Sequence, residues 1–367
     1  MSKIIMRTYI SLFWTILLSC IAISCEKENY GAPDKDKYIY DIPQTNISSE
    51  VITGAYYNNF STAVNEAKSP EVPELGWYTT ADAGVMEQHV EWADKAGLDF
   101  FIFTWDNTGN EAGLIDLFDA ARNTKQADVK YILRYNTSHL GLSNENPLQG
   151  EVKYRQMMND FVDILNVYLS SDSYYTIDGK PVMIMTPANL SSDALLSIDY
   201  AKVVSSLKHD LKSFFNLDLY IIGEMTTGWV APVNYADHQV YSFDGFTLRD
   251  WKTRSYDVFF GYFSFLDINW NNWKTTLAKR NVDFVPCIYP SYNDRKNDTK
   301  SYYYTFSEDG NTDDFVNFCN VAKRNMGSNQ IVLMNSWNNW NEGTNLEPSD
   351  LKEENFLNVA YQQFNVF

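Results

Sequence analysis

Residues 331 to 348 read Ile331-Val332-Leu333-Met334-Asn335-Ser336-Trp337-Asn338-Asn339-Trp340-Asn341-Glu342-Gly343-Thr344-Asn345-Leu346-Glu347-Pro348. The first four residues are an apolar run of the kind that a strand covered on both faces requires. The run gives way to a loop with two Trp and five Asn in the eleven residues from Asn335 to Asn345. Trp offers a flat apolar face, Asn donates and accepts hydrogen bonds, and Glu can transfer a proton. A polar surface turn is the alternative, but this composition favours a functional loop suited to sugars.

Other apolar runs of strand length lie along the chain, and most are continuously apolar, as buried parallel strands are. With Gln330–Trp337 they make eight, the others being Val51–Tyr57, Asp99–Trp105, Lys130–Asn136, Pro181–Thr186, Leu219–Met225, Gly245–Leu248 and Phe284–Pro290.

Apolar residues at helical spacing lie between several of these runs. The predicted helices are Gly84–Gly97, Glu151–Leu169, Asp199–Phe215, Asp313–Lys323 and Lys352–Phe364. Alternating strands and helices indicate parallel α/β packing, and eight strands in this length favour one (β/α)₈ TIM barrel over residues 49–367. A doubly wound sheet is the rival, but no Gly-rich phosphate-binding turn follows the first strand.

Residues 1–24 have the layout of a signal peptide. Lys3 and Arg7 precede an almost wholly apolar stretch, Thr8–Ile23, which is soon ended by charge. Small and apolar residues then lead to Cys25, which predicts lipidation of Cys25 as in bacterial lipoproteins. Cys20 is the competing site, and plain secretion with an incidental cysteine is a further alternative.

Residues 25–48 are predicted to be the lipidated cysteine and a flexible tether, because residues 26–48 are polar and carry turn formers. The acidic residues directly after Cys25 resemble the export signal of Bacteroidetes surface lipoproteins. We therefore expect a protein of the cell envelope, exposed at the surface and held to the outer membrane by its lipid anchor alone.

Charge and composition exclude several partners. The net charge of −18 argues against nucleic acid, and against an anionic polymer unless a local basic patch exists; the sequence reveals no such patch. None of the four His is spaced with another as a metal pair, so we expect no metal and no cofactor. Cys287 and Cys319 lie in apolar patterns and are expected to be buried free thiols.

In a barrel, the functional site lies at the carboxyl ends of the strands. Aromatic, amide and carboxylate residues follow several predicted strands. They are Tyr56, Tyr57, Trp105, Asp106, Tyr135, Asn136, Glu224, Tyr289, Asn293, Trp337, Trp340, Asn341 and Glu342. Each alone has an ordinary explanation as a core, ion-pairing or helix-capping residue. Together on one rim they favour a site for an oligosaccharide or polysaccharide, because rings stack on apolar sugar faces while amides and carboxylates bind hydroxyls.

The loop Asn338-Asn339-Trp340-Asn341-Glu342-Gly343 resembles the strand-eight motif of glycoside hydrolase family 99 and the related WbsX-type proteins. Their pattern is Asn-Glu-Trp-His/Ala-Glu-Gly. Weaker similarities lie in the segments 54–57, 87–105, 177–182 and 290–294. The resemblance runs from about Val51 onward and implies a (β/α)₈ barrel that acts on α-mannoside-type glycans. It also implies that Glu342 is the general acid, while the motif's first Glu helps the 2-hydroxyl of the substrate displace the leaving group.

The chain departs from this motif at Asn339, which stands where the family has its first Glu, and at Asn341, in the His or Ala position. Asn takes no proton at neutral pH, although it can orient a 2-hydroxyl. Glu224 and Asp106 are the candidate replacement bases. Two functions stay open, a glycoside hydrolase, which we favour, and a non-catalytic glycan-binding lipoprotein. Glycosyl transfer is supported only by the name of some WbsX relatives, and nucleotide-sugar donors are lacking outside the cytoplasm.

Overall fold

The computed structural model describes residues 39–186, 198–225, 240–250, 261–299 and 305–366. Cys20, Cys25 and the predicted tether up to residue 38 lie outside these ranges. The chain divides into a unit of residues 1–40 and a unit Asp41–Phe367, and the second carries every element below.

A parallel sheet forms the centre of this unit. Its strands are β1 (Ile52–Tyr57), β2 (Phe100–Trp105), β3 (Lys130–Asn136), β5 (Lys180–Thr186), β6 (Tyr220–Met225), β7 (Gly245–Leu248), β8 (Asp283–Val285), β9 (Cys287–Ile288) and β10 (Ile331–Met334). They pair in the order β8-β7-β6-β5-β3-β2-β1-β10-β9. The eight predicted strands are confirmed, and so is the single α/β barrel.

The barrel closes through a strand that proline interrupts. Pro286 separates β8 from β9 because proline has no N–H to donate to the sheet. β8 pairs with β7, whereas β9 pairs with β10. The carbonyl of Pro286 still accepts a hydrogen bond from the N–H of Leu333 at 2.8 Å. β8 and β9 are therefore two segments of one interrupted strand. Counted in this way, the described part of the barrel has eight strands.

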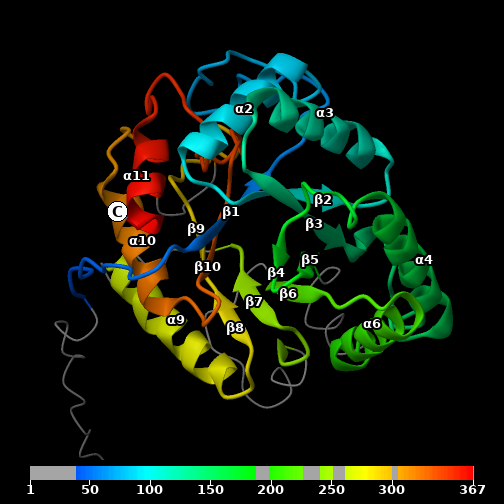
Figure 1. The fold of residues 1–367 in the computed structure, drawn as a ribbon. Helices are drawn as coiled ribbons and strands as arrows, with labels where there is room; N and C mark the ends of the chain where they lie inside the picture. The colour runs from blue at the N-terminus through cyan, green and yellow to red at the C-terminus, as the bar shows by residue number, and fades with distance from the viewer. Residues whose placement is uncertain (1–38, 187–197, 226–239, 251–260, 300–304, 367) are drawn as a thin grey trace, which may run out of the picture. The chain divides into compact units, whose positions relative to one another are not determined.

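Helices surround the strands (Figure 1). They are α2 (Ala83–Lys95), α3 (Asn110–Lys125), α4 (Glu151–Val167), α6 (Tyr200–Phe215), α9 (Tyr262–Ala278), α10 (Asp313–Asn325) and α11 (Asn355–Phe364), with a short 3₁₀ helix, η2 (Thr137–Leu140). The five predicted helices are confirmed. α3 and α9 were not predicted, because Asn, Gly and Thr in one and aromatic residues that also suit strands in the other lower their helix propensity.

A short hairpin accompanies β5. β4 (Thr176–Ile177) pairs antiparallel with β5 through a two-residue turn. Its central residues, Asp178 and Gly179, have φ angles of 50° and 74°. Two positive φ angles define the type I′ turn whose twist matches that of the flanking strands.

Toward the carboxyl ends of the strands, the barrel interior changes from apolar to polar. Inward-facing side chains recur every second residue along a strand. The apolar layers include Phe100, Ile102, Ile132, Val182, Ile184, Ile222, Val285, Cys287 and Leu333. One step further along the same faces lie the residues that we call the polar floor: Tyr56, Thr104, Arg134, Thr186 and Glu224. These side chains contact one another, as described next.

Candidate functional site at the carboxyl ends of the strands

The polar floor is organised around the carboxylate of Glu224, which is fully buried. The Nε of Arg134 donates to both Glu224 oxygens at 3.1 and 3.0 Å, and its Nη2 donates to Oε1 at 2.7 Å. The hydroxyl of Tyr56 donates to Oε2 at 2.7 Å, and that of Thr186 donates to Oε1 at 3.2 Å. Arg134 also donates to Thr104 Oγ1 at 3.4 Å. Both oxygens of Glu224 are thus surrounded by donors.

A second guanidinium reaches the same carboxylate. Arg249 follows β7, and its Nη1 lies 3.6 Å from Glu224 Oε1. Burial raises the pKa of Glu224, but the charges of Arg134 and Arg249, with the hydrogen bonds from Arg134 and Tyr56, bring that pKa down to about 2. A carboxylate with so little affinity for protons is poorly suited to act as a base. The geometry favours a role for Glu224 in holding the two arginines.

The structure brings Asn339 and Glu342 together in the loop after β10. The Nδ2 of Asn339 donates to Glu342 Oε2 at 2.8 Å. The backbone N–H of Asn339 is fixed by Ser336 Oγ at 2.6 Å, and the N–H of Asn293 donates to the carbonyl of Glu342 at 2.8 Å. Asn339 and Glu342 are only partly buried. The pair is therefore held in place while keeping exposed surface.

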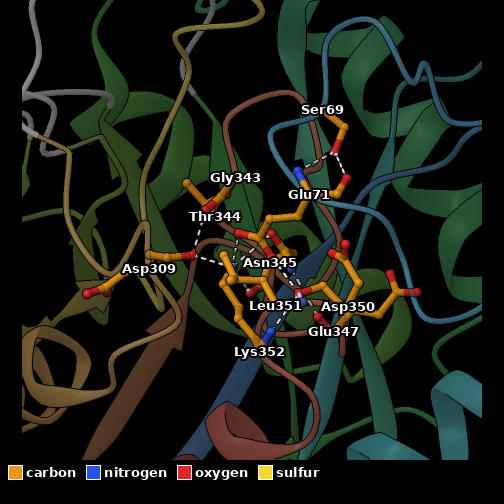
Figure 2. Close-up of polar contacts among 12 residues, drawn as sticks. Ser69, Glu71, Asp309, Gly343, Thr344, Asn345, Glu347, Asp350, Leu351 and Lys352 are labelled. Carbon is orange, nitrogen blue, oxygen red and sulfur yellow. Dashed lines mark hydrogen bonds and ion pairs between the residues drawn. The ribbon is translucent and has the colours of Figure 1, made fainter.

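A buried ion pair, the loop clamp, holds this loop from below (Figure 2). Lys352 Nζ lies 2.8 Å from Glu71 Oε1, and the two side chains are 0% and 4% exposed. The ammonium group also donates to Ser291 Oγ at 2.5 Å and to Asn345 Oδ1 at 3.1 Å. Burial lowers the pKa of Lys352, and Glu71 opposes that shift. The clamp joins the segments that follow β1, β9 and β10.

The expectation that Trp337, Trp340 and Tyr57 line the site is corrected. The two Trp residues are 0% exposed and Tyr57 is 4% exposed, so these rings present no face to a sugar. Trp337 packs edge-on against Phe101 at 5.1 Å between ring centroids, and Trp340 Nε1 donates to the hydroxyl of Tyr78 at 3.0 Å. Because side chains alternate along a strand, Tyr57 points away from the barrel interior that Tyr56 faces.

Tyr57 also belongs to a buried hydrogen-bond network with His89, Glu347 and Tyr78, which was not predicted from the sequence. The hydroxyl of Tyr57 lies 2.9 Å from His89 Nδ1, and His89 Nε2 lies 3.0 Å from Glu347 Oε1. Tyr78 donates to the other oxygen of Glu347 at 2.5 Å. Since the carboxylate accepts from Nε2, Nδ1 is left to accept from Tyr57, which a neutral imidazole satisfies. The network joins α2 to the loop after β10.

Trp105 and Tyr135 also belong to the wall of the barrel. Their rings stack at 5.4 Å, and they are 4% and 0% exposed, which corrects the expectation that they contact a ligand. The hydroxyl of Tyr135 donates to Asp160 Oδ2 at 2.7 Å, and His139 Nε2 lies 2.8 Å from the same oxygen. Asp160 therefore ties β3 and η2 to α4.

The remaining predicted polar residues lie around the rim. Asn136 caps η2, accepting a hydrogen bond from the N–H of Ser138 at 3.2 Å. Asp106 is partly exposed, and its pKa is raised by burial and by its hydrogen bond to Glu111. Asp106 thus has the increased proton affinity that a base requires, which Glu224 lacks.

Tyr289 and Asn341 complete the set. Tyr289 is buried, and its hydroxyl donates to the carbonyl of Arg249 at 2.9 Å. The buried Oδ1 of Asn341 has no hydrogen-bond partner among the residues that the structure describes.

Within the described part of the chain, no group of three or more His, Cys, Asp or Glu side chains is placed to hold a metal ion. In the same ranges, no helix is long and apolar enough to cross a membrane. Cys287 and Cys319 are buried and free, as predicted.

Comparison with known proteins gives a family and a fold. The profile of a family described as Glycosyltransferase WbsX matches residues 59–360. A solved structure titled "Glycoside hydrolase-like protein" is similar at 24% identity and a TM-score of 0.74, covering 91% of this chain and 99% of that one. The GH99 endo-α-mannosidase from Bacteroides thetaiotaomicron is similar at 19% identity and a TM-score of 0.62, covering 84% and 95%. At these identities the likeness establishes the fold. No match is found among the curated proteins.

Proposed function

The chain belongs to the WbsX family, and from this premise we propose that it is a glycan-active protein that hydrolyses glycosidic bonds with Glu342 as the general acid. One observation carries the proposal. Asn339 Nδ2 holds Glu342 Oε2 at 2.8 Å in a partly exposed loop at the carboxyl ends of the strands, where barrel enzymes place their catalytic groups.

Each side chain then has a role. Glu342 donates a proton to the glycosidic oxygen as the bond to the anomeric carbon breaks. Asn339 uses its Nδ2 to orient Glu342, which leaves its Oδ1 to accept a hydrogen bond from a sugar hydroxyl. Asn339 takes no proton, so we assign the base to Asp106, a partly exposed carboxylate directly after β2 on the same rim, which takes a proton from the 2-hydroxyl or the water that attacks the anomeric carbon.

The test is hydrolysis of α-mannan-type oligosaccharides by the wild type, Glu342→Gln and Asn339→Glu, with binding measured by calorimetry. Loss of a general acid typically slows a reaction by about 10²–10⁴-fold, so Glu342→Gln should lose turnover while keeping its affinity. Asn339→Glu should raise turnover if assistance by the 2-hydroxyl is latent here. Glu91→Gln is the matched control, because Glu91 is an exposed residue of helix α2 that pairs with Lys125, the last residue of α3. Turnover that survives Glu342→Gln would remove Glu342 from the mechanism.

A non-catalytic glycan-binding protein is the second candidate. Two observations favour it: Asn339 replaces a carboxylate, and Glu224 is fully engaged by arginines and hydroxyls. Wild-type protein that binds an oligosaccharide without cleaving it would support this candidate. Adding a sugar acceptor to the same assay also separates hydrolysis from glycosyl transfer, because transfer yields lengthened products.

A further inference from the structure

Two guanidinium groups, those of Arg134 in the polar floor and of Arg249 after β7, lie against the carboxylate of Glu224. Arg134 forms a bidentate pair with Glu224 and is 9% exposed. The Nη1 of Arg249 lies 3.6 Å from Glu224 Oε1, longer than a hydrogen bond, and the guanidinium lies 5.8 Å from the centroid of the Tyr56 ring. Among the residues that the structure describes, Glu224 is the one carboxylate within 4.0 Å of Arg249. The two guanidinium groups and the one carboxylate therefore carry a net charge of +1 together.

Arg249 is the member of this group that solvent or a ligand can reach. Its side chain is 28% exposed, whereas that of Glu224 is 0% exposed. Its backbone is fixed on both sides, because its N–H donates to the carbonyl of Met225 at 2.9 Å and its own carbonyl accepts from Tyr289 at 2.9 Å. The backbone that carries this guanidinium is therefore held by hydrogen bonds at the carboxyl ends of the strands.

An unsatisfied hydroxyl lies on the same strand face. A Cβ added at Gly245 would meet Val285 and Ile222 inside the barrel, so Gly245, Thr247 and Arg249 share the inward face of β7. Thr247 pairs in register with Glu224 and is 0% exposed. Its hydroxyl has no hydrogen-bond partner within the described ranges. Buried hydroxyls normally have one, so the strand face that carries Arg249 also holds an unsatisfied polar group.

We infer that Arg249, with Arg134 on its buried side, forms a subsite for an oxyanion carried by the glycan, such as the carboxylate of a uronic acid or a sulfate ester. This inference rests on the proposed glycan-active function. A planar guanidinium binds such groups through two parallel hydrogen bonds, which an uncharged hydroxymethyl group cannot match. The net charge of −18 opposes acidic glycans at long range, but screening limits that repulsion while the close contact persists.

The experiment measures binding of matched oligosaccharides. Each uronic-acid-containing member is paired with its carboxyl-reduced neutral counterpart, and each sulfated member with its desulfated counterpart. We expect at least one acidic member to bind about tenfold or more tightly than its neutral counterpart, with a preference that falls as salt rises. The carboxylate and sulfate pairs identify which oxyanion the subsite takes.

Variants assign the preference to Arg249. Arg249→Gln should abolish it and Arg249→Lys should keep part of it, with folding checked for both by thermal unfolding. Arg280→Gln is the matched control, because Arg280 is exposed and lies between the end of α9 and the start of β8, at the amino ends of the strands. A preference that persists in Arg249→Gln overturns the inference. Equal or tighter binding of the neutral members also overturns it but leaves the proposed function standing, whereas binding of no glycan at all ends both.

Discussion

The carboxylate of Glu224 is fully buried beside two arginines, and their positive charges lower its pKa. Its pKa is about 2 in the folded protein, against an ordinary value of 4.5. A carboxyl with a depressed folded-state pKa stabilises the fold above its ordinary pKa and loses that contribution as the pH falls toward the folded value. The window for this loss therefore runs from about pH 4.5 to about pH 2.

Acid should weaken the wild type through this residue. We expect the free energy of unfolding to fall by about 3 kcal/mol across that window on account of Glu224. Glu224→Gln should lack this component. At pH 7 it should be about 3–5 kcal/mol less stable than the wild type, because Arg134 and Arg249 lose their counter-charge. Urea unfolding at pH 7 and pH 2 measures both effects. Parallel losses in the wild type and the variant would show that Glu224 does not govern the acid response.

Single residues were predicted unevenly from the sequence, and the reason is geometric. Glu342 and Asn339 share one short loop, so their proximity followed from the chain itself. Arg249 reaches Glu224, and Thr247 comes into register with it, only once β6 and β7 pair in the sheet, and alternation decides which side chains face inward. The same alternation turns Tyr57 outward, although Tyr56 beside it belongs to the polar floor.

Among the elements, the loop after β10 depends most on distant partners. Lys352 and Glu71 bury their charges against each other, and breaking such a pair from one side leaves an uncompensated charge in the interior. We expect Lys352→Met to lower the free energy of unfolding by about 3–5 kcal/mol.

The double variant Lys352→Met with Glu71→Gln separates charge from packing. It should recover much of the loss, since no unpaired charge remains. Chemical denaturation of the two single variants and the double variant completes the cycle. Additive losses in the double variant would mean that the two side chains contribute independently, against the clamp described above.

In the hairpin of β4 and β5, Gly179 allows the free-energy cost of a positive φ angle to be measured apart from side-chain packing. Gly179 has a φ angle of 74° with open space around its Cα, so an added methyl group meets no atom but is strained by the backbone. We expect Gly179→Ala to destabilise the protein by about 1 kcal/mol. Gly113 in α3 also has open space but a helical backbone, so Gly113→Ala should stabilise by about 0.5–1 kcal/mol. Equal effects of the two substitutions in thermal unfolding would contradict this account.

Strands were easier to predict than helices because a strand covered on both faces must be apolar along its whole length. β2 and β10 carry that signal plainly. α3 and α9 bury residues at helical spacing, but the Gly and Asn of α3 and the aromatic residues and Asn of α9 have weak helix propensity, so the local signal for a helix is weaker. Tertiary contacts, rather than local preference, stabilise such helices.

For the molecule as a whole, closure of the barrel turns separated residues into one site. Pro286 interrupts one strand, yet its segments β8 and β9 still pair with β7 and β10 respectively. The carboxyl ends of β6, β7 and β10 therefore belong to the same rim of the barrel. Length and alternation of elements were enough to predict this architecture. The net charge of −18 did not predict that two arginines, Arg134 and Arg249, lie beside one carboxylate in the barrel.

Attachment to a membrane is the last property of the whole molecule that the sequence predicts, and Cys25 lies outside the residues that the structure describes. We propose that Cys25 carries the acyl chains of a bacterial lipoprotein. Each buried CH₂ contributes about 0.8 kcal/mol, so more than one chain is needed for stable anchoring, and loss of the cysteine should release the protein entirely. Cys25→Ala should therefore move the protein from the membrane fraction to the soluble fraction, whereas Cys20→Ala should leave it membrane-bound. The barrel should fold in both variants, because Asp41–Phe367 forms a unit of its own. Release by Cys20→Ala together with retention in Cys25→Ala would assign the anchor to Cys20.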